Sequence, residues 1–326
     1  PLGQGIANAV GMALAERMLA AQFGDSVVDH YTYAFAGDGC LMEGISHEAI
    51  SLAGHLRLNK LIVLFDDNKI SIDGSTDLPV SDDQAARFTA AGWHVQAIDG
   101  HNPDEIADAI SRARQSDAPS MIACRTVIGY GAPHKQGSEA THGAALGDDE
   151  IAATRKALSW PHAPFEIPQD ILDAWRAAGT RGKDARAKWQ DRLQSTDAAT
   201  QQEFRRRIAG DLPAGWSEAV AALKRQFGEE QPKIATRQAS KITLDTLAAA
   251  IPELVGGSAD LTGSNLTQAN DMTPVSAGDY GGRYLYFGVR EHAMAAILNG
   301  LALHGGFVPY GATFLIFTDY CRPSIR

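Results

Sequence analysis

Residues 31–39 read YTYAFAGDG and residues 61–68 read LIVLFDDN, so two short apolar runs both end in polar side chains. Apolar runs of this length that alternate with helix-like segments are typical of buried strands in a parallel α/β sheet. In such a sheet, ligands bind beyond the carboxyl ends of the strands, which is where Asp38 and Asn68 are expected. The two runs therefore predict an α/β fold with a polar site at one edge of its sheet.

The same alternation extends over the first 150 residues and returns after residue 238. Helical segments are expected at 2–22, 43–58, 103–115, 242–250 and 291–303. Further strand-like segments are expected at 93–98, 121–128, 254–259 and 284–288, and the run FVPYGATF at 307–314 follows the last helix. We therefore expect two α/β domains, residues 1–150 and 236–326, each with a parallel sheet flanked by helices.

Residues 151–235 have a different composition and are expected to form a helical connector. They hold 14 Lys+Arg, 11 Asp+Glu and four of the five tryptophans, and they are broken by prolines. Mixed charge on a helix usually marks a solvated face. A basic surface for a partner is therefore the less favoured interpretation of this segment.

The composition limits the function classes. With 326 residues the chain has room for two or three domains, and its formal net charge of −10 argues against a nucleic-acid or anionic membrane partner. Its three cysteines make no disulfide framework, so a reducing cytoplasm is expected. No apolar run of the given sequence reaches membrane-spanning length, and no signal peptide is visible in it. Because the sequence opens at Pro1 without a methionine, we expect it to be an internal part of a longer protein.

The two polar strand ends suggest chemistry when taken together. Asp-Gly after a strand is by itself an ordinary turn. However, the Asp38 carboxylate, the Asn68 amide oxygen and a nearby backbone carbonyl would form a set of hard oxygen ligands suited to Mg²⁺ or Ca²⁺. Three such ligands leave room in an octahedral coordination shell for two phosphate oxygens and a water. Gly39 would allow the backbone to approach a phosphate. The pair of motifs thus predicts a metal–diphosphate site.

Five longer strings carry a family resemblance. They are GDGCLMEGISHEA at 37–49, DDNKISIDG at 66–74, IGYGAPHKQGSEATHGAALG at 128–147, GGSADLTGSNLT at 256–267 and FGVREHAMAAILNG at 287–300. These strings strongly resemble the transketolases, thiamine-diphosphate enzymes of the pentose phosphate pathway. The resemblance covers essentially the whole sequence, whereas the family chain is about twice as long. It implies the thiamine-diphosphate-binding fold, with a diphosphate-binding (PP) domain and the start of a pyrimidine-binding (Pyr) domain.

The resemblance also implies a cofactor site for thiamine diphosphate. Asp38, Asn68 and the carbonyl of Ile70 would hold the divalent ion, which could be Mg²⁺, Ca²⁺ or Mn²⁺. Gly39 and Asn68 would contact the diphosphate. The residues expected around the thiazolium are Leu2, Ile72 and Ile128. Those expected beside the aminopyrimidine, or next to the cofactor across a subunit interface, are Phe314, Phe317, Tyr320 and Asp260.

The catalytic and substrate residues follow from the same resemblance. Glu291 would be the catalytic carboxylate, bonded to a ring nitrogen of the aminopyrimidine, although an acidic residue in a helix's first turn is also ordinary. His142 would lie close to both cofactor and substrate, where a neutral imidazole can bond to and relay protons from a sugar hydroxyl. Arg237 and Ser264 would bind the substrate phosphate. The role of His134, in the same loop as His142, stays open.

The implied reaction moves a two-carbon ketol unit from a ketose phosphate such as xylulose 5-phosphate to an aldose phosphate such as ribose 5-phosphate or erythrose 4-phosphate. The family works as a cytoplasmic homodimer, so Asp38 and Glu291 are expected to meet across the subunit interface. Three alternatives remain at this point. They are another thiamine-diphosphate enzyme (dihydroxyacetone synthase or deoxyxylulose-phosphate synthase), a nucleotide-binding dehydrogenase suggested by Gly3-Gln-Gly5, and a non-catalytic subunit or fragment.

Overall fold

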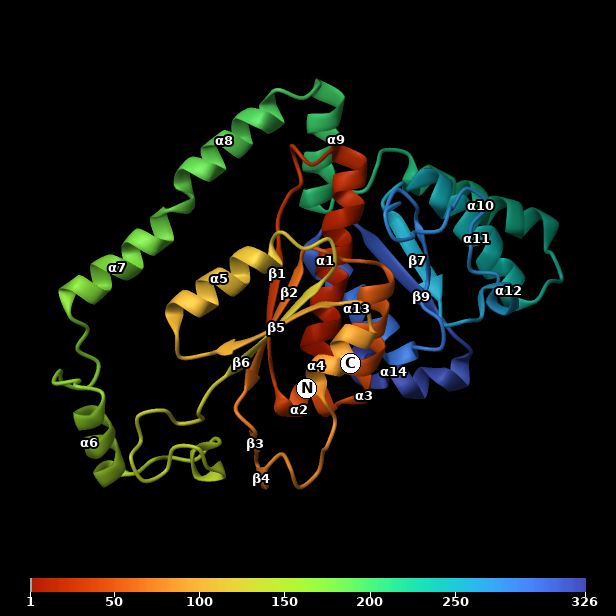
Figure 1. Cartoon of the computed structure of the whole chain (residues 1–326). Coiled ribbons are helices and arrows are strands. Elements are labelled where there is room, and N and C mark those ends of the chain that lie inside the picture. The colour runs from red at the N-terminus through yellow and green to blue at the C-terminus, as the bar shows by residue number, and fades with distance from the viewer. Residues whose placement is uncertain (1) are drawn as a thin grey trace.

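The computed structural model describes residues 2–326, and its first sheet contains four parallel strands in the order β1-β2-β6-β5 (Figure 1). The strands are β1 (Thr32–Gly37), β2 (Leu61–Asp67), β5 (His94–Asp99) and β6 (Ser120–Arg125). The β2 side chains from Leu61 to Phe65 are buried, because a central strand of a parallel sheet is covered on both faces. The expected parallel α/β sheet is confirmed.

The helices of this first part are α1 (Gln4–Phe23), α2 (Asp38–Met42), α3 (Gly44–His55), α4 (Gln84–Ala90) and α5 (Pro103–Ala113). Local capping explains where two of them begin. The Asn102 side chain accepts the backbone N–H groups of Asp104 and Glu105 before α5, and the Asp83 side chain accepts that of Ala86 before α4. Two short strands, β3 (Ile70–Ser71) and β4 (Gly74–Ser75), pair antiparallel directly after β2.

Helix α1 is buried along most of its length and crosses α13 (Glu291–His304) at very close range. A Cβ added at Gly11 would lie 2.1 Å from the carbonyl oxygen of Ile297, and one at Gly300 would lie 2.1 Å from that of Asn8. Two glycines therefore let the backbones touch where any larger residue would force the helices apart. This crossing joins the first sheet's helices to those of the second sheet.

Most of residues 148–230 are helical. Its helices are α6 (Asp148–Ala157), α7 (Gln169–Thr180), α8 (Gly182–Gln194), α9 (Ala198–Ala209) and α10 (Trp216–Glu230). Helices α7 and α8 form an arm that extends away from the sheets (Figure 1), and α7 has no buried residue. The arm is fixed within the second half of α8, where Trp189 Nε1 donates to the carbonyl of Val27 at 2.7 Å.

The second sheet has three parallel strands in the order β8-β7-β9. Its strands are β7 (Leu254–Ser258), β8 (Tyr284–Tyr286) and β9 (Val308–Ala312), and its further helices are α11 (Thr236–Ala250), α12 (Thr262–Asn265) and α14 (Thr318–Ile325). This confirms the return of the α/β pattern. Within residues 2–326, none of the helices combines the length and apolarity that crossing a bilayer requires.

Candidate active site

A cavity of about 680 Å³ lies where β1 and β2 end. Its lining includes eight of the residues selected from the sequence: Leu2, Asp38, Gly39, Asn68, Ile70, Ile72, Ile128 and His142. The strand register explains why residues 30 apart meet here, since Gly37 at the end of β1 pairs with Asp66 at the end of β2. The expected convergence of Asp38 and Asn68 at one edge of the sheet is thus what the structure shows.

Backbone hydrogen bonds hold the turn after β2 in place. Lys69 adopts a φ of 63°, and its N–H donates to Asp38 Oδ2 at 3.2 Å. The N–H of Ile70 donates to Asn68 Oδ1 at 2.9 Å, and Asn68 Nδ2 donates to Asp66 Oδ2 at 3.1 Å. These bonds orient the acidic and amide side chains before any ligand is present.

The electrostatics of the cavity disfavour a negative charge on Asp38. Burial, together with the neighbouring Asp67 carboxylate, raises the pKa of Asp38 above its usual value, although the Lys69 N–H acts in the opposite direction. The nearest cation is already engaged, because Lys69 Nζ lies 2.8 Å from Asp67 Oδ1. An external cation beside Asp38 would remove this unfavourable energy.

The donor set fits a hard divalent ion. Residues 2–326 contain no cluster of three or more His, Cys, Asp or Glu side chains arranged around a metal position. The predicted set is of another kind, because it combines one carboxylate with an amide oxygen and a main-chain carbonyl. The Asp38 carboxylate and the Asn68 amide oxygen each accept one backbone N–H. Further lone pairs on these oxygens are therefore free to bind an ion.

The cavity also has an apolar part. The apolar side chains of Leu2 and Ile72 are 56% and 75% exposed although they line a cavity, so their apolar surface lacks a partner. A Cβ at Gly39 would lie 3.3 Å from the Leu2 side chain and would narrow the space at the start of α2. These features leave apolar surface open to a ligand next to the polar groups of Asp38 and Asn68.

The other seven residues selected from the sequence do not line this cavity. Phe314, Phe317 and Tyr320 form a separate aromatic group, with neighbouring ring centroids 5.7 and 6.1 Å apart. Glu291 is buried at the first turn of α13. Elsewhere on the second α/β unit, Arg237 Nη1 donates to the carbonyl of Ser264 at 3.4 Å. The exposed Asp260 follows β7 with a φ of 58°.

Some cavity residues were not expected from the sequence. Cys40, Ser71 and Asp73 line it as well. Ser71 and Asp73 lie in or beside the β3–β4 hairpin, and the Asp73-Gly74 dipeptide is the turn signal that could have revealed it. His134 is not among the lining residues, because it faces Glu150 at the start of α6.

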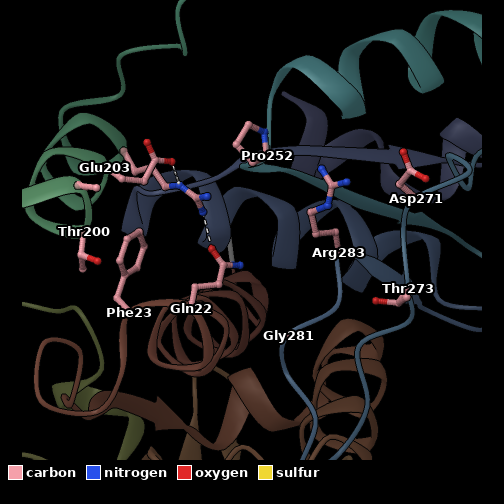
Figure 2. Close-up of a pocket in the computed structure, with 11 residues that line it drawn as sticks. Gln22, Phe23, Thr200, Glu203, Pro252, Asp271, Thr273, Gly281 and Arg283 are labelled. Atoms are coloured by element: carbon pink, nitrogen blue, oxygen red, sulfur yellow. Dashed lines mark hydrogen bonds and ion pairs between the residues drawn. The ribbon is translucent and has the colours of Figure 1, made fainter. Parts of the chain in front are cut away.

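A second hollow, of about 650 Å³, lies between α1, α9 and residues 271–283 (Figure 2). Two of its charged side chains, Glu203 and Arg207, are paired with one another. Arg207 bonds to Glu203 and to Gln22, as the dashed lines of Figure 2 mark. Next to it, Arg206 bonds to Glu203 and to the buried Glu253. No residue selected from the sequence lines this cleft.

Comparison with known proteins identifies the family. Residues 1–213 match the family model of the transketolase thiamine diphosphate binding domain, and residues 232–326 match that of the transketolase pyrimidine binding domain. The chain belongs to the transketolase family. It is 59% identical over 326 residues to a transketolase of Cereibacter sphaeroides and 55% identical over 328 residues to one of Sinorhizobium medicae.

Solved transketolase structures share the fold. A transketolase from Leishmania mexicana is 42% identical with a TM-score of 0.92, and a variant from Pichia stipitis in complex with fructose 6-phosphate is 38% identical with a TM-score of 0.93. Both alignments cover 100% of this chain but only 49% and 50% of the solved chains. The chain likewise spans about half the length of the curated relatives it matches, 49% and 47% for the two above. The resemblance to transketolases is thereby confirmed, and the alternative families are not favoured.

Proposed function

We propose that the whole protein is a transketolase that uses thiamine diphosphate and a divalent ion to move a two-carbon ketol unit from a ketose phosphate to an aldose phosphate. The observation that carries this proposal is the meeting of Asp38, Asn68 and His142 around one cavity in a chain of this family. Solved relatives from Pichia stipitis are described as complexes with xylulose 5-phosphate, fructose 6-phosphate and sedoheptulose 7-phosphate. These sugar phosphates are the substrate class we propose, with the pentose phosphate pathway and the cytoplasm as setting.

Within the cavity, we assign Asp38, Asn68 and the Ile70 carbonyl to the divalent ion, Mg²⁺ or alternatively Ca²⁺ or Mn²⁺. Gly39 and Asn68 would contact the diphosphate, and the apolar surfaces of Leu2, Ile72 and Ile128 would cover the thiazolium. Thiamine diphosphate supplies a nucleophilic carbon and an electron sink when bound. The protein contributes orientation, because the hydrogen-bonded turn at 66–70 fixes the ligands in advance.

The remaining roles are proposed from the family strings. His142 would accept and return a proton at a sugar hydroxyl, for which its exposed position beside the cavity is suitable. Glu291 would hold a proton at a ring nitrogen of the aminopyrimidine. Phe314, Phe317 and Tyr320 would cover that ring, Asp260 would lie beside the cofactor, and the Arg237–Ser264 pair would bind the substrate phosphate.

We further propose a homodimer with shared active sites and with domains 1–150, 151–235 and 236–326. Two observations support the dimer. Glu291 does not line the cavity that contains Asp38, so one chain does not bring these two carboxylates to a common pocket. The large apolar side chains of Leu315, Ile316 and Tyr320 are 87%, 73% and 65% exposed, which suits a contact with a second subunit. Light scattering on the whole protein tests this, and an active monomer would contradict it.

The proposed function is tested by a transfer assay with xylulose 5-phosphate, ribose 5-phosphate, thiamine diphosphate and Mg²⁺, which follows sedoheptulose 7-phosphate. We expect cofactor-dependent product from the whole protein. Glu291→Gln should retain cofactor binding and lower turnover by about 10²- to 10⁴-fold, because it removes an acid–base group. The exposed Glu229→Gln is the matched control. Absence of product from the wild-type protein would refute the transketolase proposal, and near-normal turnover of Glu291→Gln would refute the role of that residue.

A further inference from the structure

The segment that carries His142 is long and has little secondary structure of its own. Between the end of β6 at Arg125 and the start of α6 at Asp148, it contains one short 3₁₀ turn, Glu139–Thr141. Both ends of the segment matter for the cavity, since Ile128 and His142 line it. A loop of this length needs specific contacts to keep one conformation, because ordering each residue opposes folding by about 1–2 kcal/mol of backbone entropy.

A buried carboxylate supplies such a contact. The Glu150 side chain, at the first turn of α6, is only 7% exposed. Its Oε1 accepts the backbone N–H of His134 at 2.9 Å, and its Oε2 accepts Nδ1 of the same residue at 2.7 Å. These bonds to His134 lower the pKa of Glu150, so the carboxylate is charged at neutral pH. One side chain thus bonds to both the main chain and the ring of a residue 16 positions earlier.

Residues that follow His134 are hydrogen-bonded to both ends of the loop. Next to His134, Lys135 Nζ donates to the carbonyl of Leu146 at 2.7 Å, which closes the segment that contains His142. On the other side, the N–H of Gly137 donates to the carbonyl of Ile128 at 2.8 Å. Holding residue 134 therefore restrains the loop from Ile128 to Leu146.

We propose that Glu150 is a positioning residue that clamps His134 and thereby holds the 128–147 loop against the cavity before any ligand binds. The inference rests on the proposed function for the role of His142, and it assigns His134 to the clamp instead of the cavity. A loop that is ordered beforehand binds its ligand more tightly, because the ordering does not have to occur on binding. Loss of the clamp should weaken binding more than it slows turnover at saturation.

The test uses a graded set of variants of the whole protein. Glu150→Ala removes both bonds, Glu150→Gln keeps an acceptor of nearly the same size, and His134→Ala removes only the ring contact. The matched control is Asp149→Asn, which neutralises the neighbouring first-turn acid of α6, a side chain that is exposed. It separates the clamp from the general effect of acidic residues on the start of a helix.

The first readout is hydrogen exchange without ligand. We expect the amide protection of residues 134–137 to fall by about tenfold in Glu150→Ala, by less in Glu150→Gln and His134→Ala, and not in the control. Calorimetric titration with thiamine diphosphate in Mg²⁺ should show the Kd rising in the same order, by about tenfold at most. The KM for xylulose 5-phosphate should rise likewise, while kcat stays within about threefold of the wild type.

The outcomes separate the clamp from general destabilisation. A purely structural role would lower kcat at unchanged KM, because fewer molecules are folded, and this result would overturn the proposal. Unchanged exchange at residues 134–137 in Glu150→Ala would also overturn it. If the wild-type protein shows no transfer activity, the proposed function fails, while hydrogen exchange and cofactor titration still decide the clamp.

Discussion

The cavity at Asp38 and the cleft of Figure 2 have similar volumes, about 680 and 650 Å³, and carboxylates line both. In the cleft, hydrogen bonds from Arg206, with a further contribution from Arg207, lower the pKa of Glu203 to about 2. In the cavity, burial and the nearby Asp67 raise the pKa of Asp38. One hollow thus stabilises the charged form of its acid with its own arginines, and the other does not.

The difference shows why pocket size alone is a poor guide to function. Charged groups that satisfy one another offer little to a ligand, because a ligand would have to replace bonds already made. A buried acid without a cation of its own is in an unfavourable state that a bound ion improves. By this criterion the Asp38 cavity is the better candidate for a ligand site, and the paired Glu203, Arg206 and Glu253 are a structural junction between α9 and the residue before β7.

Arg206→Ala should give the largest effect, since it removes the partner of a buried acid. Arg206 bonds to both oxygens of Glu253, at 2.6 and 3.0 Å, and the Glu253 side chain is only 4% exposed. Leaving that charge unpaired should lower the free energy of unfolding by about 3–5 kcal/mol. Chemical denaturation measures this, with the exposed Arg205→Ala as the control. Equal stability of the two variants would show that the cleft's ion pairs do not support the fold.

Asp38→Asn should have the opposite character, affecting ligand binding and leaving the apoprotein intact. Without ligands, the variant should be as stable as the wild type or slightly more stable, because a buried charge next to Asp67 is removed. With Mg²⁺ and thiamine diphosphate at about 100 times Kd, the wild type should gain about 2.7 kcal/mol and the variant little. Thermal unfolding of the whole protein with and without both ligands checks this. The same gain in Asp38→Asn would argue against a metal at this position, and Asp77→Asn is the exposed control.

The smallest expected effect is a pH dependence of the free energy of unfolding that comes from Glu203 in the cleft. Because the pKa of Glu203 is about 2 in the fold against an ordinary 4.5, the unfolded chain takes up this proton first as the pH falls. The contribution of ionised Glu203 to the stability of the fold is therefore complete above pH of about 5 and is lost as the pH falls toward 2. Since Glu203 is about one-third exposed, we expect less than about 1 kcal/mol. The stability difference between wild type and Glu203→Gln should shrink between pH of about 5 and 3, and a constant difference would contradict this.

Local sequence patterns predicted the sheet and the polar edge of the cavity because both depend on neighbouring parallel strands, whereas Leu2, Ile72, Ile128 and His142 came from the family resemblance. Asp38 and Asn68 each end a strand, and parallel pairing brings strand ends together. The same patterns were less informative about where each strand ends. The apolar run 121–128 predicts a strand to Ile128, yet β6 ends at Arg125 and the chain turns away to bring Ile128 to the cavity. The two-residue strands β3 and β4 are too short to show any periodicity.

Pairing between distant residues could not be predicted from local patterns. Arg206 and Glu253 are 47 positions apart, and Gln22 and Arg207 are 185 apart. Nothing in the charge pattern of residues 151–235 distinguishes Arg206 from its exposed neighbour Arg205. The position of Glu291 outside the Asp38 cavity likewise follows from no local pattern.

Helix α1 has a consequence for how the chain tolerates insertions and deletions. Leu2, just before the helix, lines the cavity, while Gln22 and Phe23 at its other end line the cleft about 30 Å away. Between them, Gly11 must meet Gly300 on α13. Removing one residue would rotate one end by about 100° relative to the other. We therefore expect α1 to tolerate substitutions at its few exposed positions better than the insertion or deletion of a residue.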